Sequence, residues 1–256
     1  MVPPRNPVVV IPARLAATRF SDKPLADLLG EPMIVHVWRR AVAADVGPVV
    51  VACGDAAIAD AIRAAGGDAV ITDPNLASGS DRVHQAVEQI DPDGAHDAVI
   101  NVQGDLPTIE PEIIAAALAP LAEPTVDIAT LAAVITEPRE RTDPNVVKAV
   151  LALAAGATTG RALYFSRAAV PSGEGPLYHH IGLYAFRRAA LARFVALPES
   201  VLERRERLEQ LRALEAGMRI DAALVDTVPL GVDTPADLAR ARSILLEGTP
   251  HVETSK

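Results

Sequence analysis

The sequence predicts an α/β fold: a doubly wound, mostly parallel sheet with helices on both faces. Short β-branched runs alternate with helical segments through the first half of the 256-residue chain. Half of all residues are hydrophobic but only 3% are aromatic, so aliphatic side chains must fill the core, as in helices packed on a parallel sheet. Repeated strand–helix–strand units imply right-handed crossovers between parallel strands.

The first half is expected to alternate strands and helices in a regular order. Hydrophobic residues in 33–44 recur at helical spacing, and Asp55 can cap a helix that Gly66 and Gly67 end. The predicted strands are 8–12, 48–53, 69–71, 97–102 and 126–134, and the predicted helices are 33–44, 56–65, 82–90 and 111–121.

The second half is less regular. Thr234 is the expected cap of its last helix, with Pro235 in the first turn. The charged segment 202–212 is typical of a solvated helix laced with ion pairs. The predicted strands are 145–153, 162–167, 178–186 and 220–225, the predicted helices are 188–196, 202–215 and 235–246, and the tail 248–256 is expected to be flexible.

Charge and composition narrow the class of protein. A net charge of −9 argues against a nucleic-acid partner, which usually meets a basic face. Cys53 is the single cysteine, so no intramolecular disulfide forms, and a buried inert thiol is expected. The N-terminus has no signal-peptide pattern and no apolar run is long enough for a membrane span. We therefore expect a cytoplasmic enzyme without a membrane partner.

Polar loops follow several predicted strands, at 13–23, 73–82 and 103–107. Ligands of doubly wound sheets bind beyond the carboxyl ends of the strands, so these loops are expected to converge on one site. The first loop carries Arg14 and Lys23, with Arg19 between them, and such cations with loop amides could cradle a triphosphate. A solvated basic loop is the alternative. Kinases and dinucleotide-dependent oxidoreductases are disfavoured because neither glycine-rich phosphate motif is present.

Two aspartates stand where a magnesium–triphosphate complex needs carboxylates. Asp105 follows an apolar strand and Asp233 precedes a helix. Mg²⁺ takes one or two protein carboxylates and completes its shell with phosphate and water, although an Asp before a helix can instead be a cap. His179 and His180 are adjacent on a predicted strand and point to opposite faces, so a two-histidine metal site is not expected.

Nine motifs in order carry a family resemblance from residue 8 to about residue 246. They are PARLAATRFSDKPL, GEPMIVHVWRRA, SGSDRV, VINVQGD, PNVVKAV, ALYFSRAAVP, HIGLYAF, LERRERLEQLRAL and GVDTPADL. With them the chain resembles the 3-deoxy-manno-octulosonate (KDO) cytidylyltransferases, or CMP-KDO synthetases. The resemblance implies a nucleotide-diphospho-sugar transferase fold with a smaller dimerisation subdomain, a homodimer, and Mg²⁺-dependent conversion of CTP and KDO to CMP-KDO and pyrophosphate for lipopolysaccharide biosynthesis.

The same resemblance implies a role for individual residues. It makes Arg14, Lys23, Asp105 and Asp233 catalytic, the two aspartates as Mg²⁺ ligands. It divides the chain into a nucleotide-binding core (8–134), a sugar-acid-binding and dimerisation region (135–190) and a segment completing the active site (191–247). The implied CTP contacts are Pro12, Ala13, Arg14, Lys23, Ser78, Gly79, Arg82 and Gln103, and the implied sugar-acid contacts are Gln103, Arg167, His180, Tyr184, Glu209 and Gln210.

The chain departs from the family pattern at a few positions. Ser21 and Asp22 replace the usual Pro-Gly, Leu106 replaces a Glu, and His179 replaces an Arg. These changes keep two alternatives open. One is CMP transfer to another acceptor, such as a related ulosonic acid, an amino-KDO analogue or a phosphonate. The other is a non-catalytic nucleotide-binding homologue.

Overall fold

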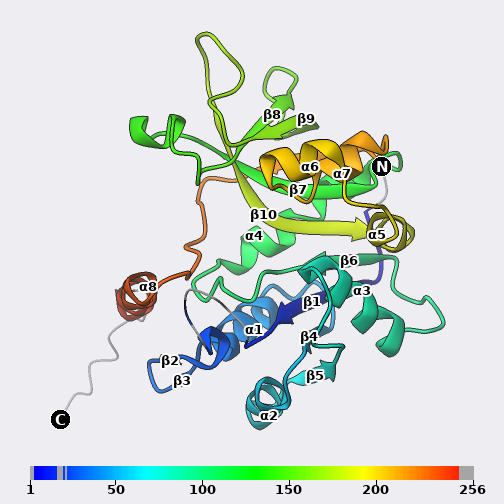
Figure 1. The fold of residues 1–256 in the computed structure, drawn as a ribbon, viewed down its shortest axis with the longest axis vertical. Coiled ribbons are helices and arrows are strands. Elements are labelled where there is room, and N and C mark those ends of the chain that lie inside the picture. The colour runs from blue at the N-terminus through cyan, green and yellow to red at the C-terminus, as the bar shows by residue number, and fades with distance from the viewer. Residues whose placement is uncertain (1–2, 16–19, 21, 248–256) are drawn as a thin grey trace.

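A nine-stranded sheet organises residues 3–15, 20 and 22–247, which the computed structural model describes (Figure 1). Its strand order is β5–β4–β1–β6–β10–β7–β11–β9–β8, and β2 and β3 form a separate small hairpin. The strands are β1 (Pro7–Ala13), β2 (Asp27–Leu28), β3 (Glu31–Pro32), β4 (Val49–Cys53), β5 (Asp68–Ile71), β6 (Ala98–Asn101), β7 (Ile128–Val134), β8 (Lys148–Ala152), β9 (Thr159–Ser166), β10 (Tyr178–Arg187) and β11 (Ile220–Leu224).

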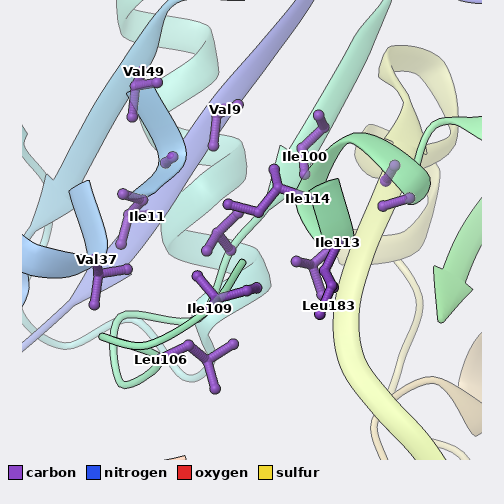
Figure 2. Packing of buried hydrophobic residues seen from close by; sticks show 14 of the residues in the cluster. Val9, Ile11, Val37, Val49, Ile100, Leu106, Ile109, Ile113, Ile114 and Leu183 are labelled. Atoms are coloured by element: carbon purple, nitrogen blue, oxygen red, sulfur yellow. The ribbon is translucent and has the colours of Figure 1, made fainter. Parts of the chain in front are cut away.

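Helices cover both faces of the sheet, as the sequence predicts. Val9 and Ile11 of β1 face the core under α1, α2 and α4 (Figure 2), whereas Val8 and Val10 face the core under α3, α5 and α7. The central strand is therefore apolar on both faces. The helices are α1 (Met33–Ala43), α2 (Ala56–Ala64), α3 (Gly79–Ile90), α4 (Pro111–Ala116), α5 (Arg188–Val195), α6 (Val201–Glu206), α7 (Leu211–Glu215) and α8 (Pro235–Glu247), with 3₁₀ turns at Lys23–Leu25, Ala119–Ala122 and Pro138–Arg141.

The sheet is parallel only in part, which corrects the prediction of a mostly parallel sheet. β5, β4, β1 and β6 are parallel neighbours, and β7 and β11 form another parallel pair. Between these groups lies β10, antiparallel to both β6 and β7. The hairpin β8–β9 is also antiparallel and extends the far edge. β10, which comes late in the chain, therefore pairs with β6. The sequence around β6 does not predict this pairing, because the two strands lie far apart in the chain.

Several helix ends differ from their predicted positions for local reasons. α3 begins at Gly79, because Ser78 and Asp81 form a reciprocal capping box there. Asp55 occupies the N-cap position of α2, but its carboxylate accepts a hydrogen bond from the Leu15 amide (2.9 Å) and makes no cap bond. The helix predicted over 111–121 ends at Ala116 and resumes as a 3₁₀ turn that contains Pro120.

The single helix predicted over 202–215 is two helices with a break between them. α6 ends at Glu206, and Arg207 adopts a left-handed conformation (φ 56°, ψ 48°). The segment is also less solvated than predicted, because Glu203 is buried and pairs with Arg212 across the break. The sequence does not predict this break, because residue 207 is an arginine and not a glycine or proline.

Helix α8 lies apart from the sheet, beside the β2–β3 hairpin (Figure 1). A small cluster that includes Leu28, Met33, Val232 and Ala241 attaches it. Thr234 caps this helix as predicted, since its hydroxyl accepts from the Asp237 amide at 3.2 Å. Within the described ranges, no helix has both the length and the apolar character needed to cross a membrane. The tail 248–256 lies outside the described residues.

Candidate functional site

A pocket of about 530 Å³ opens beyond the carboxyl ends of β1 and β6, and we call it the main pocket. It holds every residue that the sequence analysis assigned to CTP or to the metal. Phe20, Pro24, Leu76 and Gly104 were not foreseen, although all but Leu76 lie inside the quoted motifs. The lining residues are Pro12, Ala13, Arg14, Phe20, Lys23, Pro24, Leu76, Ser78, Gly79, Arg82, Gln103, Gly104, Asp105 and Asp233.

Backbone packing brings the loops of the main pocket together. The Val102 amide donates to the Val10 carbonyl (3.1 Å), so the loops after β1 and β6 leave the sheet side by side. A Cβ at Gly104 would lie 2.7 Å from the carbonyl oxygen of Pro12, so only glycine allows this approach. Gly79 adds the first turn of α3, and backbone amides at a helix N-terminus favour an anion.

The two aspartates proposed as metal ligands converge on one cation, the Lys23 ammonium. Its Nζ lies 3.0 Å from Asp105 Oδ2 and 3.0 Å from Asp233 Oδ1. Burial by itself lowers the pKa of Lys23, but both carboxylates oppose it and the pKa is raised overall. The Val232 amide donates to the Asp105 carbonyl (2.9 Å) and holds the loops that carry these carboxylates together.

Asp233 is not the cap of α8, which was the competing interpretation. Thr234 fills that role, and the Asp237 carboxylate accepts in return from the backbone amides of Asp233 (3.2 Å) and Thr234 (2.9 Å). The Asp233 side chain is instead 66% exposed and directed to Lys23. It is therefore free to take part in ligand binding.

Arginines supply positive charge on the other side of the main pocket. Arg82 is only 2% exposed, donates to the Thr72 hydroxyl, and has no carboxylate within salt-bridge distance in the part of the chain described. Burial and the nearby Arg14 lower the pKa of Arg82, but a guanidinium stays charged in proteins. Arg14 is exposed at the mouth. Arg19 and Ser21, considered in the sequence analysis, lie outside the described residues.

A second, small cavity lies beside the main pocket on the other side of the α3 first turn. Gly79 lines the main pocket, and the next residue, Ser80, lines the small cavity. The cavity's volume of about 10 Å³ is of the order that one water molecule needs. Its lining residues are Ser80, Ile128, Tyr184, Phe186, Phe194, Glu209 and Gln210.

Two residues that line the small cavity carry buried polar atoms without a protein partner. Glu209 Oε2 accepts from the Ser80 hydroxyl at 2.9 Å, but Glu209 Oε1 and Gln210 Nε2 are buried without a protein partner. Leaving such atoms unpaired is costly, so a polar ligand or water is expected to satisfy them. Burial, and then the charge of Glu209, raise the pKa of the Tyr184 phenol, so this group remains a neutral hydrogen-bond donor.

His180 lies behind the small cavity and does not line it. Its Nε2 is 3.0 Å from the Thr130 hydroxyl, and its ring packs between Phe165 and Tyr184 at centroid distances of 4.6 and 5.7 Å. Burial lowers the pKa of His180 to about 3, so the ring is neutral near pH 7. A neutral ring therefore packs against Tyr184, the other aromatic residue for which the resemblance implied a sugar-acid contact.

Arg167 is another implied sugar-acid contact that does not line the small cavity. Its guanidinium donates to the backbone carbonyls of Pro144 (2.9 Å), Glu206 (2.9 Å) and Arg207 (3.4 Å). It lines neither cavity, because these carbonyls hold it at the base of the β8–β9 hairpin. Gln103, assigned to both substrates, lines the main pocket and donates to Asn101 (3.3 Å).

Three departures from the family pattern that the structure describes, Leu106, Asp22 and His179, also lie outside both cavities. Leu106 is 9% exposed and packs in the apolar core near Ile109 and Leu183 (Figure 2). Asp22 is exposed and does not line the main pocket. His179 points away from His180, with Nδ1 4.0 Å from Glu140. No group of three or more His, Cys, Asp or Glu residues that could hold a metal is found in the described chain.

Known proteins share this fold and sequence over nearly the whole chain. A family model described as cytidylyltransferase matches residues 8–220. The 3-deoxy-manno-octulosonate cytidylyltransferase of Rhodospirillum centenum is 71% identical over 242 residues, or 94% of each chain. That of Paramagnetospirillum magneticum is 67% identical over 94% of this chain and 98% of its own.

The chain belongs to the 3-deoxy-manno-octulosonate cytidylyltransferase family. A solved structure of CMP:2-keto-3-deoxy-manno-octonic acid synthetase complexed with CTP aligns with a TM-score of 0.88 and 37% identity. The alignment covers 96% of this chain and 100% of that one. A nucleotidyl transferase from Methanothermobacter thermautotroptrophicus, 14% identical with a TM-score of 0.63, shares the fold alone. The nucleotidyltransferase type of α/β fold predicted for this cytidylyltransferase is thus confirmed.

Proposed function

We propose that this cytidylyltransferase transfers CMP from CTP to 3-deoxy-D-manno-octulosonate and releases pyrophosphate, with Mg²⁺ as cofactor. The observation that carries the proposal is the convergence of all implied CTP residues on one pocket that also holds Asp105 and Asp233. The family relatives support 3-deoxy-manno-octulosonate as the acceptor. The unpaired atoms of Glu209 and Gln210 in the small cavity supply polar groups that could bind it.

The donor set suits Mg²⁺. Asp105 and Asp233 already share one cation, since the Lys23 ammonium touches both. Two carboxylates, with phosphate and water oxygens, make the shell that this ion prefers. When bound, Mg²⁺ would neutralise phosphate charge and favour the deprotonated form of the sugar hydroxyl. Lys23 would then be free to reach a phosphate oxygen.

The protein's own residues would act by positioning and by charge. The anomeric oxygen of the sugar forms a bond to the α-phosphorus of CTP as the bond between that phosphorus and the pyrophosphate oxygen breaks; the hydroxyl proton passes to solvent. Arg14 and Lys23 would stabilise the charge that develops on the departing pyrophosphate. Ser78 and Gly79 would hold the nucleotide at the start of α3, and Gln103 would lie between the two substrates.

On the acceptor side, Tyr184, Glu209 and Gln210 would bind the sugar hydroxyls. A neutral phenol, a carboxylate and an amide together offer both donors and acceptors. The cavity would have to widen around the sugar, since it now has room for about one water. Because Arg167 is committed to backbone carbonyls, we place it outside the direct contacts and give it a role in holding the segment that carries Glu209.

The assembly and the cellular location remain predictions. We propose a homodimer built from 135–190, which is supported by the exposed apolar side chains of Val134 and Leu163 at and near this region. A single species of twice the monomer mass in light scattering would support it, and a monomer at micromolar concentration would contradict it. A cytoplasmic location is proposed because CTP is a cytoplasmic substrate.

Pyrophosphate release tests the proposed reaction directly. The purified protein is assayed with Mg²⁺ and KDO, and with CTP, ATP, GTP or UTP in turn. Release is expected with CTP alone, and only when both KDO and metal are present. A panel of other ulosonic acids, amino-KDO analogues and phosphonates tests the acceptor. Turnover of another acceptor in preference to KDO would contradict the assigned substrate, and no turnover at all would contradict the proposed reaction.

A further inference from the structure

A network of hydrogen bonds centred on Glu206 holds the break between α6 and α7. The Glu206 carboxylate accepts from the Ser166 hydroxyl (2.8 Å), the Arg167 amide (3.1 Å) and the Tyr164 phenol (3.4 Å), all on or next to β9. The Glu206 carbonyl accepts in turn from Arg167 Nε at 2.9 Å. Glu206 is therefore fixed to β9 through both its side chain and its backbone.

The residue after this anchor adopts a conformation that needs support. Arg207 is left-handed (φ 56°), which is disfavoured for any residue with a Cβ. Its amide donates to the Glu203 carbonyl (2.7 Å), and its carbonyl accepts from Arg167 Nη2 (3.4 Å). Its side chain is exposed, so the contacts described for this residue are the hydrogen bonds of its backbone. The anchors on either side of Arg207 hold the chain in this turn.

The turn determines where the next residues point. Leu208 is buried in the core, and Glu209 and Gln210 then face the small cavity. Glu209 Oε1 and Gln210 Nε2 have no protein partner, and the Ser80 hydroxyl bond to Glu209 Oε2 (2.9 Å) holds only one of the two side chains. Apart from that bond, their position depends on the backbone that leads into them, and Glu206 fixes that backbone.

We infer that Glu206 is a positioning residue for the acceptor site, acting through the left-handed turn at Arg207 on Glu209 and Gln210. This inference rests on the proposed function, in which these two side chains bind the sugar acid. Glu206 lines neither cavity and so makes no direct contact with either site. The main pocket is built from other segments, so CTP binding does not depend on it.

The test is the response of the two Michaelis constants to Glu206→Gln. The amide keeps the size of the side chain but loses the charge and an acceptor oxygen. We expect the KM for KDO to rise ~10-fold, the equivalent of one buried hydrogen bond, with the KM for CTP unchanged. Ser166→Ala, which removes the shortest of the three bonds, is the milder second variant and should change the KM for KDO by ~3-fold. Glu199→Gln, an exposed carboxylate before α6, is the matched control and should change neither constant.

A rescue variant separates positioning from general loss of structure. Arg207→Gly relieves the left-handed strain, so adding it to Glu206→Gln should bring the KM for KDO back toward the wild-type value. Equal rises in both KM values, or a rise that Arg207→Gly leaves untouched, would overturn the inference. So would unchanged constants in both Glu206→Gln and Ser166→Ala.

Amide hydrogen exchange provides a readout that does not need turnover. Glu206→Gln should speed exchange in 207–211 while leaving β1 and β4 unchanged. If the wild-type protein failed to use KDO, the proposed function would be wrong, and exchange would still decide whether Glu206 holds the turn. Unchanged exchange in 207–211 would overturn the inference even if the wild-type enzyme turned over KDO.

Discussion

The main pocket and the small cavity lie side by side but are built in different ways. In the main pocket the Lys23 ammonium already bridges the Asp105 and Asp233 carboxylates, whereas Arg82 has no carboxylate partner among the described residues. The small cavity has room for about one water, and buried polar atoms of Glu209 and Gln210, which line it, have no protein partner. The two proposed metal ligands are thus charge-compensated before a ligand arrives, whereas the acceptor site bears a cost that its ligand can relieve.

The difference also lies in how each site is supported. The main pocket uses loops that leave β1 and β6, which are neighbouring parallel strands, together with the start of α3. The small cavity depends on β10, an antiparallel strand inserted between β6 and β7, and on the break after α6. Distant substitutions should therefore affect the acceptor side more than the nucleotide side.

The largest effect is expected at Asp233, one of the two proposed metal ligands. Asp233→Asn removes one of the two proposed Mg²⁺ ligand charges, and we expect kcat/KM to fall ~100-fold with an unchanged melting temperature. Calorimetric binding of Mg²⁺ and CTP should weaken in parallel. Near wild-type activity in this variant would remove Asp233 from the metal site.

The buried imidazole behind the small cavity should make stability depend on pH. The pKa of His180 is lowered by burial from an ordinary value near 6.5 to about 3. Between about pH 3 and pH 6.5 the imidazole is protonated in the unfolded chain but neutral in the folded protein. The free energy of unfolding is therefore greatest above pH 6.5 and falls as the pH drops. The expected loss is ~2 kcal/mol at pH 5, from ~1.4 kcal/mol per pH unit.

Urea unfolding of the wild type and of His180→Gln, at pH 5 and at pH 7.5, measures the contribution of His180 to the pH dependence of stability. The difference in unfolding free energy between the two pH values should be smaller in the variant. Parallel changes in the two proteins would show that His180 does not contribute to the pH dependence.

Gln210 offers a test of the unpaired atoms in the small cavity. Gln210→Leu replaces the buried amide by an apolar group of similar size. The Nε2 donor of that amide has no acceptor in the protein. We expect a ~10-fold rise in the KM for KDO, an unchanged KM for CTP, and a gain in stability of ~1 kcal/mol because the desolvation cost disappears. Lower stability with an unchanged KM for KDO would show that the amide serves the fold and not the acceptor.

The smallest expected effect is at the cap of α8. Thr234→Ala should reduce the free energy of unfolding by ~1 kcal/mol, because the Asp237 amide loses its partner. Activity should change little compared with Asp233→Asn, since the Asp233 side chain keeps its contact with Lys23. Thr234→Ser, which retains the hydroxyl, is the control. A loss of activity as large as in Asp233→Asn would mean that the cap itself positions the metal loop.

The nucleotide half was accessible from the amino-acid sequence because its signals are local. A strand pattern followed by a polar loop predicts where the loop lies, and the loops that carry Arg14, Ser78 and Asp105 came together as expected. On the acceptor side, Tyr184, Glu209 and Gln210 were found only through resemblance to a family. Arg167, implied in the same way, turned out to be bound to backbone carbonyls away from both cavities.

The sequence by itself determined the helix and strand types, the alternation of the first half, the two-sided apolar strand β1 and the charged loops beyond it, since each depends on residues close together in the chain. Only the tertiary structure decided that β10 separates β6 from β7, that Lys23 bridges Asp105 and Asp233, and that the chain turns at Arg207. These features depend on contacts between segments far apart in sequence, where packing and charge pairing override local preference.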